Sequence, residues 1–150
     1  MGGRSCCVAE RAFFIMVLVD TSVWVDFFAG SSAPHVERLE SLIGQRRRLY
    51  VCGVILMEVL QGIRADKEYQ RVKWYLDRMP FLPMTRNTFV GAADIYRSLR
   101  RRGITVRKPI DCLIAAVAIE HNIPLLHHDR DFDPIERHLG LKVAREANPD

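Results

Sequence analysis

The sequence lacks the cysteine patterns that would cross-link the chain or bind zinc. Its 150 residues include four cysteines, and no two of them have the Cys-x-x-Cys spacing; they are Cys6, Cys7, Cys52 and Cys112. This argues against a disulfide-rich secreted domain and against a zinc site of ordinary spacing. We therefore expect reduced thiols and a cytoplasmic protein.

Long apolar runs are missing too. The longest, Ala12 to Val19, is too short to cross a bilayer, and no A-x-A-like cleavage site follows it, so we expect no membrane association. Low-complexity tracts and internal repeats are not visible. A hydrophobic content of 49% with 27% charged residues is ordinary for a globular protein. The length fits one domain that folds without disulfide bonds or a structural metal ion.

Charge of one sign does not dominate the chain, because the formal net charge is only +4. The basic residues are nevertheless clustered, at Arg46 to Arg48, at Arg97 to Arg102, and at Arg107 with Lys108. Each cluster alone is typical of a solvated helix face or a helix C-terminus. Combined with the clustered acids described next, they favour an enzyme acting on nucleic acid, with the backbone held along an arginine-rich rim.

The chain is organised around an apolar run that ends at an acid. Phe13 to Val19 predicts a short buried strand, Asp20 follows it, and Thr21 or Ser22 can cap a helix from 23 to 29. In open α/β sheets, ligands bind at the carboxyl ends of strands. Asp20 is therefore a candidate site residue, although strand termination and helix capping explain it equally well.

A second stretch has the same construction. The short apolar run from Ile123 to Leu126 stops at His127, His128, Asp129, Arg130 and Asp131. Two strands that end in acids are harder to explain by capping than one. Either histidine is able to bind a metal, but we expect one to face the core and the other the rim of the site. Arg130 either contacts a phosphate or pairs with an acid, and the residues alone do not separate these roles.

Between and after these stretches, short strands alternate with helices. This alternation predicts an α/β fold in which helices cover both faces of a parallel sheet. The further elements expected are helices at 34–45, 54–63, 66–78, 87–101 and from 109, a strand at 48–52, an edge strand at 81–84, a loop or helix at 131–138 and a closing strand at 141–143.

Two helices carry further candidate acids. Glu58 lies at the edge of the buried stripe of helix 54–63, near enough to reach back toward the strand ends, although a lone Glu usually faces solvent. Asp111 follows Pro109 in the first turn of its helix, where the helix dipole alone explains an acid and would also keep it ionised. Trp24 and Phe28 have helical spacing that favours core packing over a binding groove.

Together the candidates are carboxylates. They are Asp20, Glu58, Asp111 and Asp129, with Asp131 nearby. Oxygen ligands with little thiolate or imidazole favour Mg²⁺ or Mn²⁺. One or two such ions would polarise a phosphodiester, activate a water molecule and stabilise the leaving oxygen. The constellation therefore indicates phosphodiester hydrolysis without a protein nucleophile.

Four segments resemble, in their order along the chain, the acidic motifs of PIN-domain ribonucleases, most closely those of the VapC toxins of toxin–antitoxin pairs. They are Val19–Trp24, Ile55–Gly62, Ile110–Ala116 and His128–Phe132. The resemblance covers about Met16 to Val143, so we expect a PIN domain at 16–145. We expect residues 1–15 to be a disordered extension or the result of a misplaced start, Met16 being the alternative start.

The resemblance implies a three-layer α/β/α sandwich around a parallel sheet of about five strands. It implies a Mg²⁺- or Mn²⁺-dependent endoribonuclease acting on tRNA or rRNA, which dimerises and is silenced by a VapB antitoxin covering an apolar groove. By position, Asp20, Glu58, Asp111 and Asp129 form the metal-binding site. Asp131 is a further ligand, and Thr21 and Ser22 orient the first acid or a bound water.

Three alternatives remain open at the level of sequence. The first is a PIN module that binds RNA or a protein without cutting, although an intact set of repelling acids has no purpose there. The second is a metal phosphohydrolase of the HD type, suggested only by His128-Asp129, which requires an all-helical fold. The third, a phosphoaspartate hydrolase, is disfavoured because Ser22 stands where a second Asp is expected.

Overall fold

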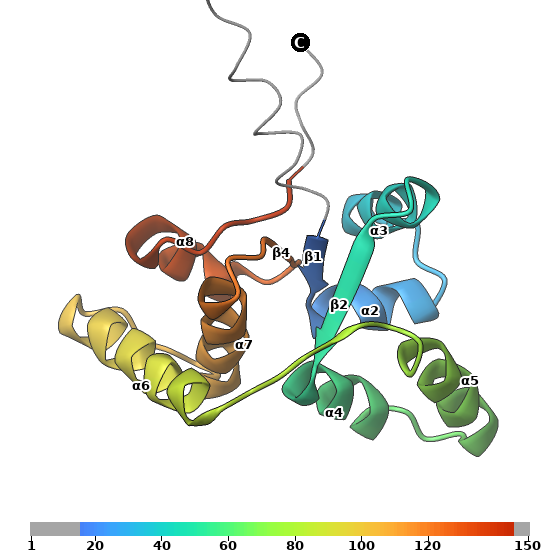
Figure 1. The fold of residues 1–150 in the computed structure, drawn as a ribbon, viewed down its shortest axis with the longest axis horizontal. Coiled ribbons are helices and arrows are strands. Elements are labelled where there is room, and N and C mark those ends of the chain that lie inside the picture. Colours follow the sequence, from blue (N-terminus) through green and yellow to red (C-terminus); the bar gives the residue numbers. More distant parts are fainter. Residues whose placement is uncertain (1–15, 146–150) are drawn as a thin grey trace, which may run out of the picture.

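The computed structural model describes residues 16–145 and is built on a small parallel sheet (Figure 1). Its four strands lie in the order β3-β2-β1-β4 and all neighbouring pairs are parallel. The strands are β1 (Met16–Val19), β2 (Arg48–Cys52), β3 (Phe81–Leu82) and β4 (Leu125–Leu126). Parallel strands all end at the same edge of a sheet, so residues that follow different strands meet there.

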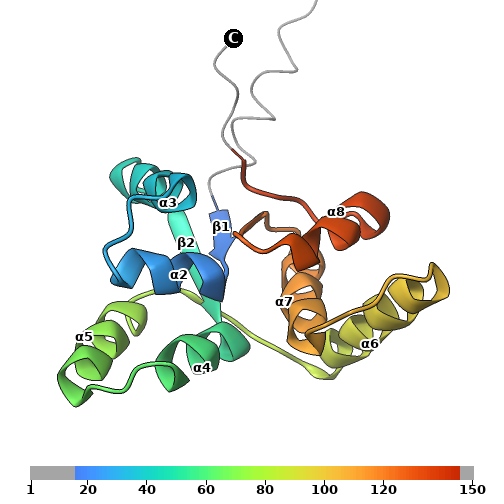
Figure 2. The ribbon, with the colours of Figure 1, turned by 180° about the vertical axis from the view of Figure 1, so that it is seen from behind.

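Helices make every connection between these strands, and two further helical segments follow β4. They are α2 (Thr21–Phe28), α3 (Pro34–Gly44), α4 (Gly53–Gln61), α5 (Asp66–Leu76), α6 (Arg86–Arg101), α7 (Pro109–Glu120), the 3₁₀ helix η1 (Arg130–Phe132) and α8 (Asp133–Leu139). Figures 1 and 2 show α2 to α5 on one side of the strands and α6 to α8 on the other. This is the three-layer α/β/α sandwich expected from the sequence.

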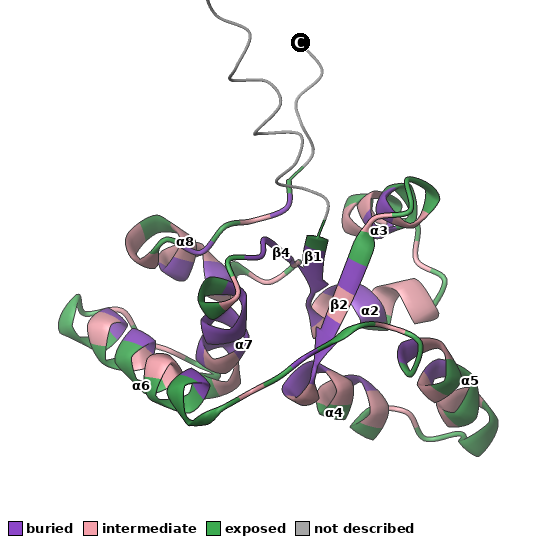
Figure 3. Ribbon diagram, in the orientation of Figure 1, coloured by how far each residue is buried: buried purple, intermediate pink, exposed green. Residues whose placement is uncertain are grey.

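The central strand β1 anchors the core. Val17, Leu18 and Val19 are fully buried, as a strand covered on both faces requires, and Leu18 lies opposite Tyr50 of β2 and Leu125 of β4. Figure 3 shows the buried residues gathered on β1, β4 and α7. A rigid element therefore ends directly at the first candidate acid.

The aromatic residues after β1 pack inward as the helical spacing predicted. Trp24 is fully buried and its ring lies 5.7 Å from that of Phe28, nearly parallel to it. Tyr75 of α5 closes the cluster, with its ring 6.0 Å from that of Trp24. Burial of this size fixes α2 on the sheet, and truncating Trp24 to alanine would cost about 3–5 kcal/mol.

Two local expectations were wrong. Helix α2 begins at Thr21, and its N-cap is Asp20 rather than Thr21 or Ser22, because the Asp20 carboxylate accepts a hydrogen bond from the Ser22 N–H at 3.0 Å. The closing strand at 141–143 is reduced to a single parallel bridge between Leu125 and Val143, so the sheet has four strands and not five. β4 is only two residues long and offers the chain after Gly140 too little backbone to pair with.

Other expectations are settled by the fold or lie outside it. The parallel sheet rules out the all-helical architecture that the HD alternative requires. Within residues 16–145, no helix has both the length and the apolar character needed to cross a bilayer. The extension at 1–15 and the start of the first strand before Met16 lie outside the described residues.

Candidate active site

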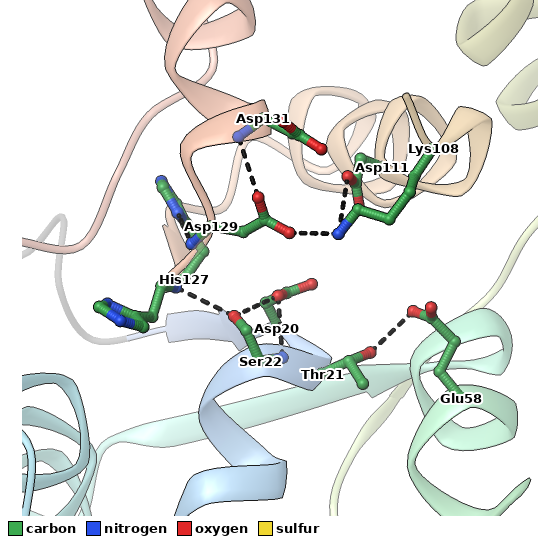
Figure 4. Close-up of polar contacts among 10 residues, drawn as sticks. Asp20, Thr21, Ser22, Glu58, Lys108, Asp111, His127, Asp129 and Asp131 are labelled. Atoms are coloured by element: carbon green, nitrogen blue, oxygen red, sulfur yellow. Dashed lines mark hydrogen bonds and ion pairs between the residues drawn. The ribbon is translucent and has the colours of Figure 1, made fainter. Parts of the chain in front are cut away.

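The candidate acids meet at the carboxyl edge of the sheet. Val19 and Leu126 are neighbours in the paired strands β1 and β4, so Asp20 and the segment 127–131 leave the sheet side by side. The Asp20 N–H donates to the Leu126 carbonyl at 2.9 Å and extends the pairing to the first acid. The first turn of α7 brings Asp111 to the same place (Figure 4).

Asp20 is almost completely buried, at 3% exposure. Its Oδ2 accepts hydrogen bonds from the Ser22 N–H at 3.0 Å and the Ser22 hydroxyl at 2.5 Å, whereas Oδ1 has no partner among the described residues. Burial raises the pKa of Asp20, and the Ser22 hydrogen bonds oppose that rise. The Ser22 hydroxyl also accepts from the His128 N–H at 3.0 Å, so it connects the first acid to the second acidic segment.

Three further carboxylates form a compact group. One oxygen from each of Asp111, Asp129 and Asp131 lies within 4.8 Å of the other two. Asp111 is 5% exposed, and its Oδ2 has no hydrogen-bond partner in the described part of the chain. Burial, helped by the neighbouring charges of Asp129 and Asp20, raises the pKa of Asp111 to about 7, against the opposing effect of Lys108.

Lys108 is the positive charge inside this group. Its ammonium donates a hydrogen bond to the Asp129 carboxylate and lies 3.5 Å from Oδ2 of Asp111. Burial alone would raise the pKa of Asp129, but the bonds from Lys108 and from the Asp131 N–H outweigh it and hold that pKa below its usual value. From the sequence Lys108 was read only as part of a basic cluster. The i, i+3 spacing to Asp111 was the available signal.

Glu58 stands apart from the three-aspartate group. Its Oε1 accepts a hydrogen bond from the Thr21 hydroxyl at 2.8 Å, so α4 and the start of α2 are joined beside Asp20. Figure 4 shows Thr21 between Asp20 and Glu58, with Asp111, Asp129 and Asp131 across from them. The structure thus brings all five predicted acids to one region, but only three of them lie close to one another. That Glu58 binds the metal directly stays a prediction.

Known proteins share both the sequence pattern and the fold. The sequence model of the PIN domain matches residues 17–137. The VapC ribonuclease Mb1587 of Mycobacterium bovis is 40% identical over 131 residues, covering 86% of this chain and 98% of that protein. The chain belongs to the PIN-domain family of VapC ribonucleases. The resemblance read from the four acidic motifs is therefore confirmed.

More distant relatives agree on the architecture. Ribonuclease VapC1 of Methanocaldococcus jannaschii is 28% identical and covers 85% of this chain and 85% of its own length. The crystal structure of VapBC2 from Rickettsia felis bound to promoter DNA superposes with a TM-score of 0.69 at 17% identity, covering 86% of this chain and 97% of that one. The VapC20 structure of Mycobacterium tuberculosis, described as a sarcin-ricin loop cleaving toxin, has a TM-score of 0.56 at 15% identity and covers 79% and 93% of the two chains. At these identities the structures show the PIN fold alone.

His127 and His128, the pair that precedes Asp129, divide as predicted. His127 is half-buried, with its ring 4.8 Å from that of Phe132, and burial lowers its pKa. His128 is exposed and stacks on His35 at 3.9 Å, nearly parallel, while His35 pairs with Asp26 at 2.6 Å. The sequence did not predict the contact of His35 with His128, because the residues around position 35 carry no signal of a partner more than ninety positions away.

A hollow of about 740 Å³ contains part of the acidic group. Its charged lining is mixed, with the cations Arg107, Lys108 and Arg130 beside Asp129, Asp131 and Asp133. Of the three basic clusters seen in the sequence, the one at 107–108 therefore borders the site. The cluster at 46–48 precedes and begins β2, so it lies at the opposite end of the sheet from the acids. The arginine-rich rim predicted from the sequence therefore does not include the cluster at 46–48.

The residues present fit a hard divalent cation. Oδ1 of Asp20 and Oδ2 of Asp111 are buried carboxylate oxygens without a hydrogen-bond partner among the described residues, which leaves both able to bind a cation; the charge nearest to Oδ2 of Asp111 is the Lys108 ammonium at 3.5 Å. All of the close candidate ligands are oxygens, which Mg²⁺ and Mn²⁺ prefer. The oxygen donors gathered in this VapC-type PIN domain therefore fit a divalent cation.

Proposed function

We propose that this chain is a Mg²⁺- or Mn²⁺-dependent endoribonuclease that acts as the toxin of a VapBC pair. The observation that carries the proposal is the convergence of Asp20, Asp111 and Asp129, two of them with an unsatisfied buried oxygen, at the carboxyl edge of the sheet. A folded domain has no stabilising reason to gather repelling acids there, since each raised pKa measures the cost of keeping the acid ionised.

The roles follow from position. Asp111, Asp129 and Asp131 would hold the ion, with Asp20 and Glu58 facing it from β1 and α4. When bound, the ion supplies polarisation of the phosphodiester and activation of a water molecule. Ser22 orients Asp20 through its hydroxyl, and Thr21 orients Glu58. Arg107 and Arg130 in the adjoining hollow hold the backbone phosphates on either side of the scissile bond.

RNA is the proposed substrate, with tRNA or rRNA as the class. The cationic side chains of Arg107, Lys108 and Arg130 in the hollow at the acids support a polyanionic substrate, and the ribonuclease names of the relatives support RNA over DNA. We place the protein in the cytoplasm, where such RNA is found. The buried free thiols of Cys52 and Cys112 agree with a reducing compartment.

A VapB-type antitoxin is the proposed partner. A largely apolar groove of about 390 Å³ lies between α2, α4 and α5, and its lining includes Val25, Phe28, Val59 and Ile63. Val25 is 49% exposed there and, with its apolar neighbours in the groove, offers a surface on which an apolar segment of a partner would pack. We also propose a homodimer, supported by a second apolar hollow on α6 and α7 beside the exposed Phe89.

The test is cleavage of total cellular RNA by the purified, partner-free protein, with Mg²⁺ or Mn²⁺ and with EDTA. We expect discrete fragments that require the metal and are lost in Asp20→Asn, while Glu40→Gln, an exposed acid on α3, cuts normally. Asparagine retains the cap of α2, so the variant should fold. Cleavage that persists in EDTA or in Asp20→Asn would refute the site. No cleavage by folded protein with either ion would favour a binding module.

A further inference from the structure

Lys108 places a positive charge among the same carboxylates that are proposed to bind the ion. It is the N-cap residue of α7, three positions before Asp111, and about half of its side chain is exposed. Its ammonium bonds Oδ2 of Asp129 and lies 3.5 Å from Oδ2 of Asp111. Figure 4 shows the ammonium between these two carboxylates. Two of the three members of the close carboxylate group thus share one internal cation.

An internal ammonium and a divalent ion compete for this place. A bound ion near Asp111 and Asp129 would stand only a few ångströms from the ammonium. Like charges so close together repel even at the effective dielectric of a protein surface, and the repulsion is twice as strong for a divalent ion as for a monovalent one. Lys108 lies against Oδ2 of Asp129 and Oδ2 of Asp111, and a divalent ion would need the same two oxygens. Oδ2 of Asp111 receives no hydrogen bond from another described residue, so it is open to either cation. The Lys108 ammonium and a divalent ion therefore cannot both be bound by the carboxylates of Asp111 and Asp129 at the same time.

The position of Lys108 allows it to leave. Its side chain is unbranched and half exposed, so it is able to rotate without disturbing the core. Lys108 already lines the hollow together with Arg107 and Arg130, so an ammonium that turns away from the acids stays on the rim, where it would contact the RNA backbone. Asp111, by contrast, is buried and fixed in the first turn of α7.

We propose that Lys108 is a built-in competitor of the divalent ion, which neutralises Asp111 and Asp129 in the metal-free protein and is displaced to the basic rim when the ion binds. This inference rests on the proposed function, since it presupposes the metal site. Its consequence is that the chain gains stability without metal at the expense of metal affinity. Removing the charge at residue 108 therefore has opposite effects on these two quantities.

The experiment is calorimetric titration of the whole chain with Mn²⁺, using Lys108→Met, which keeps the apolar stem and removes the charge. We expect Lys108→Met to bind Mn²⁺ at least several-fold more tightly than the wild type and to melt at a lower temperature in EDTA. Lys108→Arg retains the charge and should bind no more tightly than the wild type. Lys67→Met, an exposed lysine of α5, is the matched control and should change neither quantity.

The outcomes separate this inference from the metal site itself. Equal or weaker Mn²⁺ binding by folded Lys108→Met, with the wild type binding, would overturn the role of Lys108 and leave the site standing. Tighter binding by the control as well would show a general charge effect and would also overturn it. Absence of Mn²⁺ binding by both the wild type and Lys108→Met would refute the metal site, and this inference with it.

Discussion

At the scale of single residues, Asp111 shows how the site opposes the stability of the fold. Its pKa of about 7 lies above the ordinary value of 3.8, so the folded protein holds a proton there between these pH values that the unfolded chain has released. Ionising Asp111 therefore costs stability as the pH rises toward 7, and the cost is complete above it. Acids that stabilise folds have lowered pKa values, whereas the raised pKa of Asp111 means that its ionised form destabilises the fold.

Asp111→Asn should reverse this cost. In EDTA, we expect the variant to gain stability over the wild type as the pH is raised from 5 to 8, by on the order of 2 kcal/mol, because asparagine cannot ionise. Urea unfolding at both pH values measures the difference, with Asp94→Asn as the exposed control. The variant should also lose the stabilisation that Mn²⁺ gives the wild type. A difference that does not change with pH would show that Asp111 ionises normally.

The candidate residues were predictable from the sequence to the extent that their signals are local. Asp20 and Asp129 follow apolar runs, and Asp111 follows a helix-starting proline. The spacing of Lys108 to Asp111 was a local signal, but its hydrogen bond to Asp129, 21 positions away, leaves no periodic trace in the sequence. Nor does periodicity distinguish Glu58, bonded to Thr21, from a solvent-facing glutamate.

At the scale of elements, strand ends and helix starts position the chemistry. β2 and the start of α7 occur where the sequence predicted them, because the short apolar run Leu49–Cys52 and Pro109 are strong local signals. The closing strand at 141–143 failed because strand formation needs a partner, and β4 offers one residue, Leu125, to Val143. A short apolar segment such as 141–143 does not reveal how long the strand beside it in the sheet will be.

The contact between α2 and the segment after β4 depends on one hydroxyl. Ser22 donates to Asp20 and accepts from the His128 N–H. We expect Ser22→Ala to weaken Mn²⁺ binding about tenfold, as is usual when a group that orients a ligand is removed, and to lower the free energy of unfolding by about 1 kcal/mol. Calorimetry and urea unfolding measure the two effects. Ser41→Ala, on the exposed face of α3, should do neither.

Equal Mn²⁺ affinity in Ser22→Ala and the wild type would show that Asp20 is held by its backbone contacts alone. Those contacts are its N–H bond to the Leu126 carbonyl and the bond that its carboxylate accepts from the Ser22 N–H. A loss of stability without a loss of affinity would assign the hydroxyl to the fold and not to the site.

At the scale of the whole molecule, the parallel topology explains why acids far apart in the chain share one site. Asp20 follows β1, Asp129 follows β4, Glu58 lies on the helix after β2, and Asp111 begins a helix that ends before β4. All four therefore face the same edge of the sheet. The basic residues divide differently, because only those at 107, 108 and 130 line the hollow beside the acids.

The most direct test of the account is to locate Mn²⁺ by anomalous scattering in crystals of the wild-type chain soaked with the ion. We expect a peak bound by Asp111 and Asp129, with Asp20 or Asp131 completing the protein ligands and with the Lys108 ammonium moved away from both carboxylates. Manganese bound elsewhere, or an ordered chain with no peak at these acids at saturating Mn²⁺, would contradict the assignment of the site.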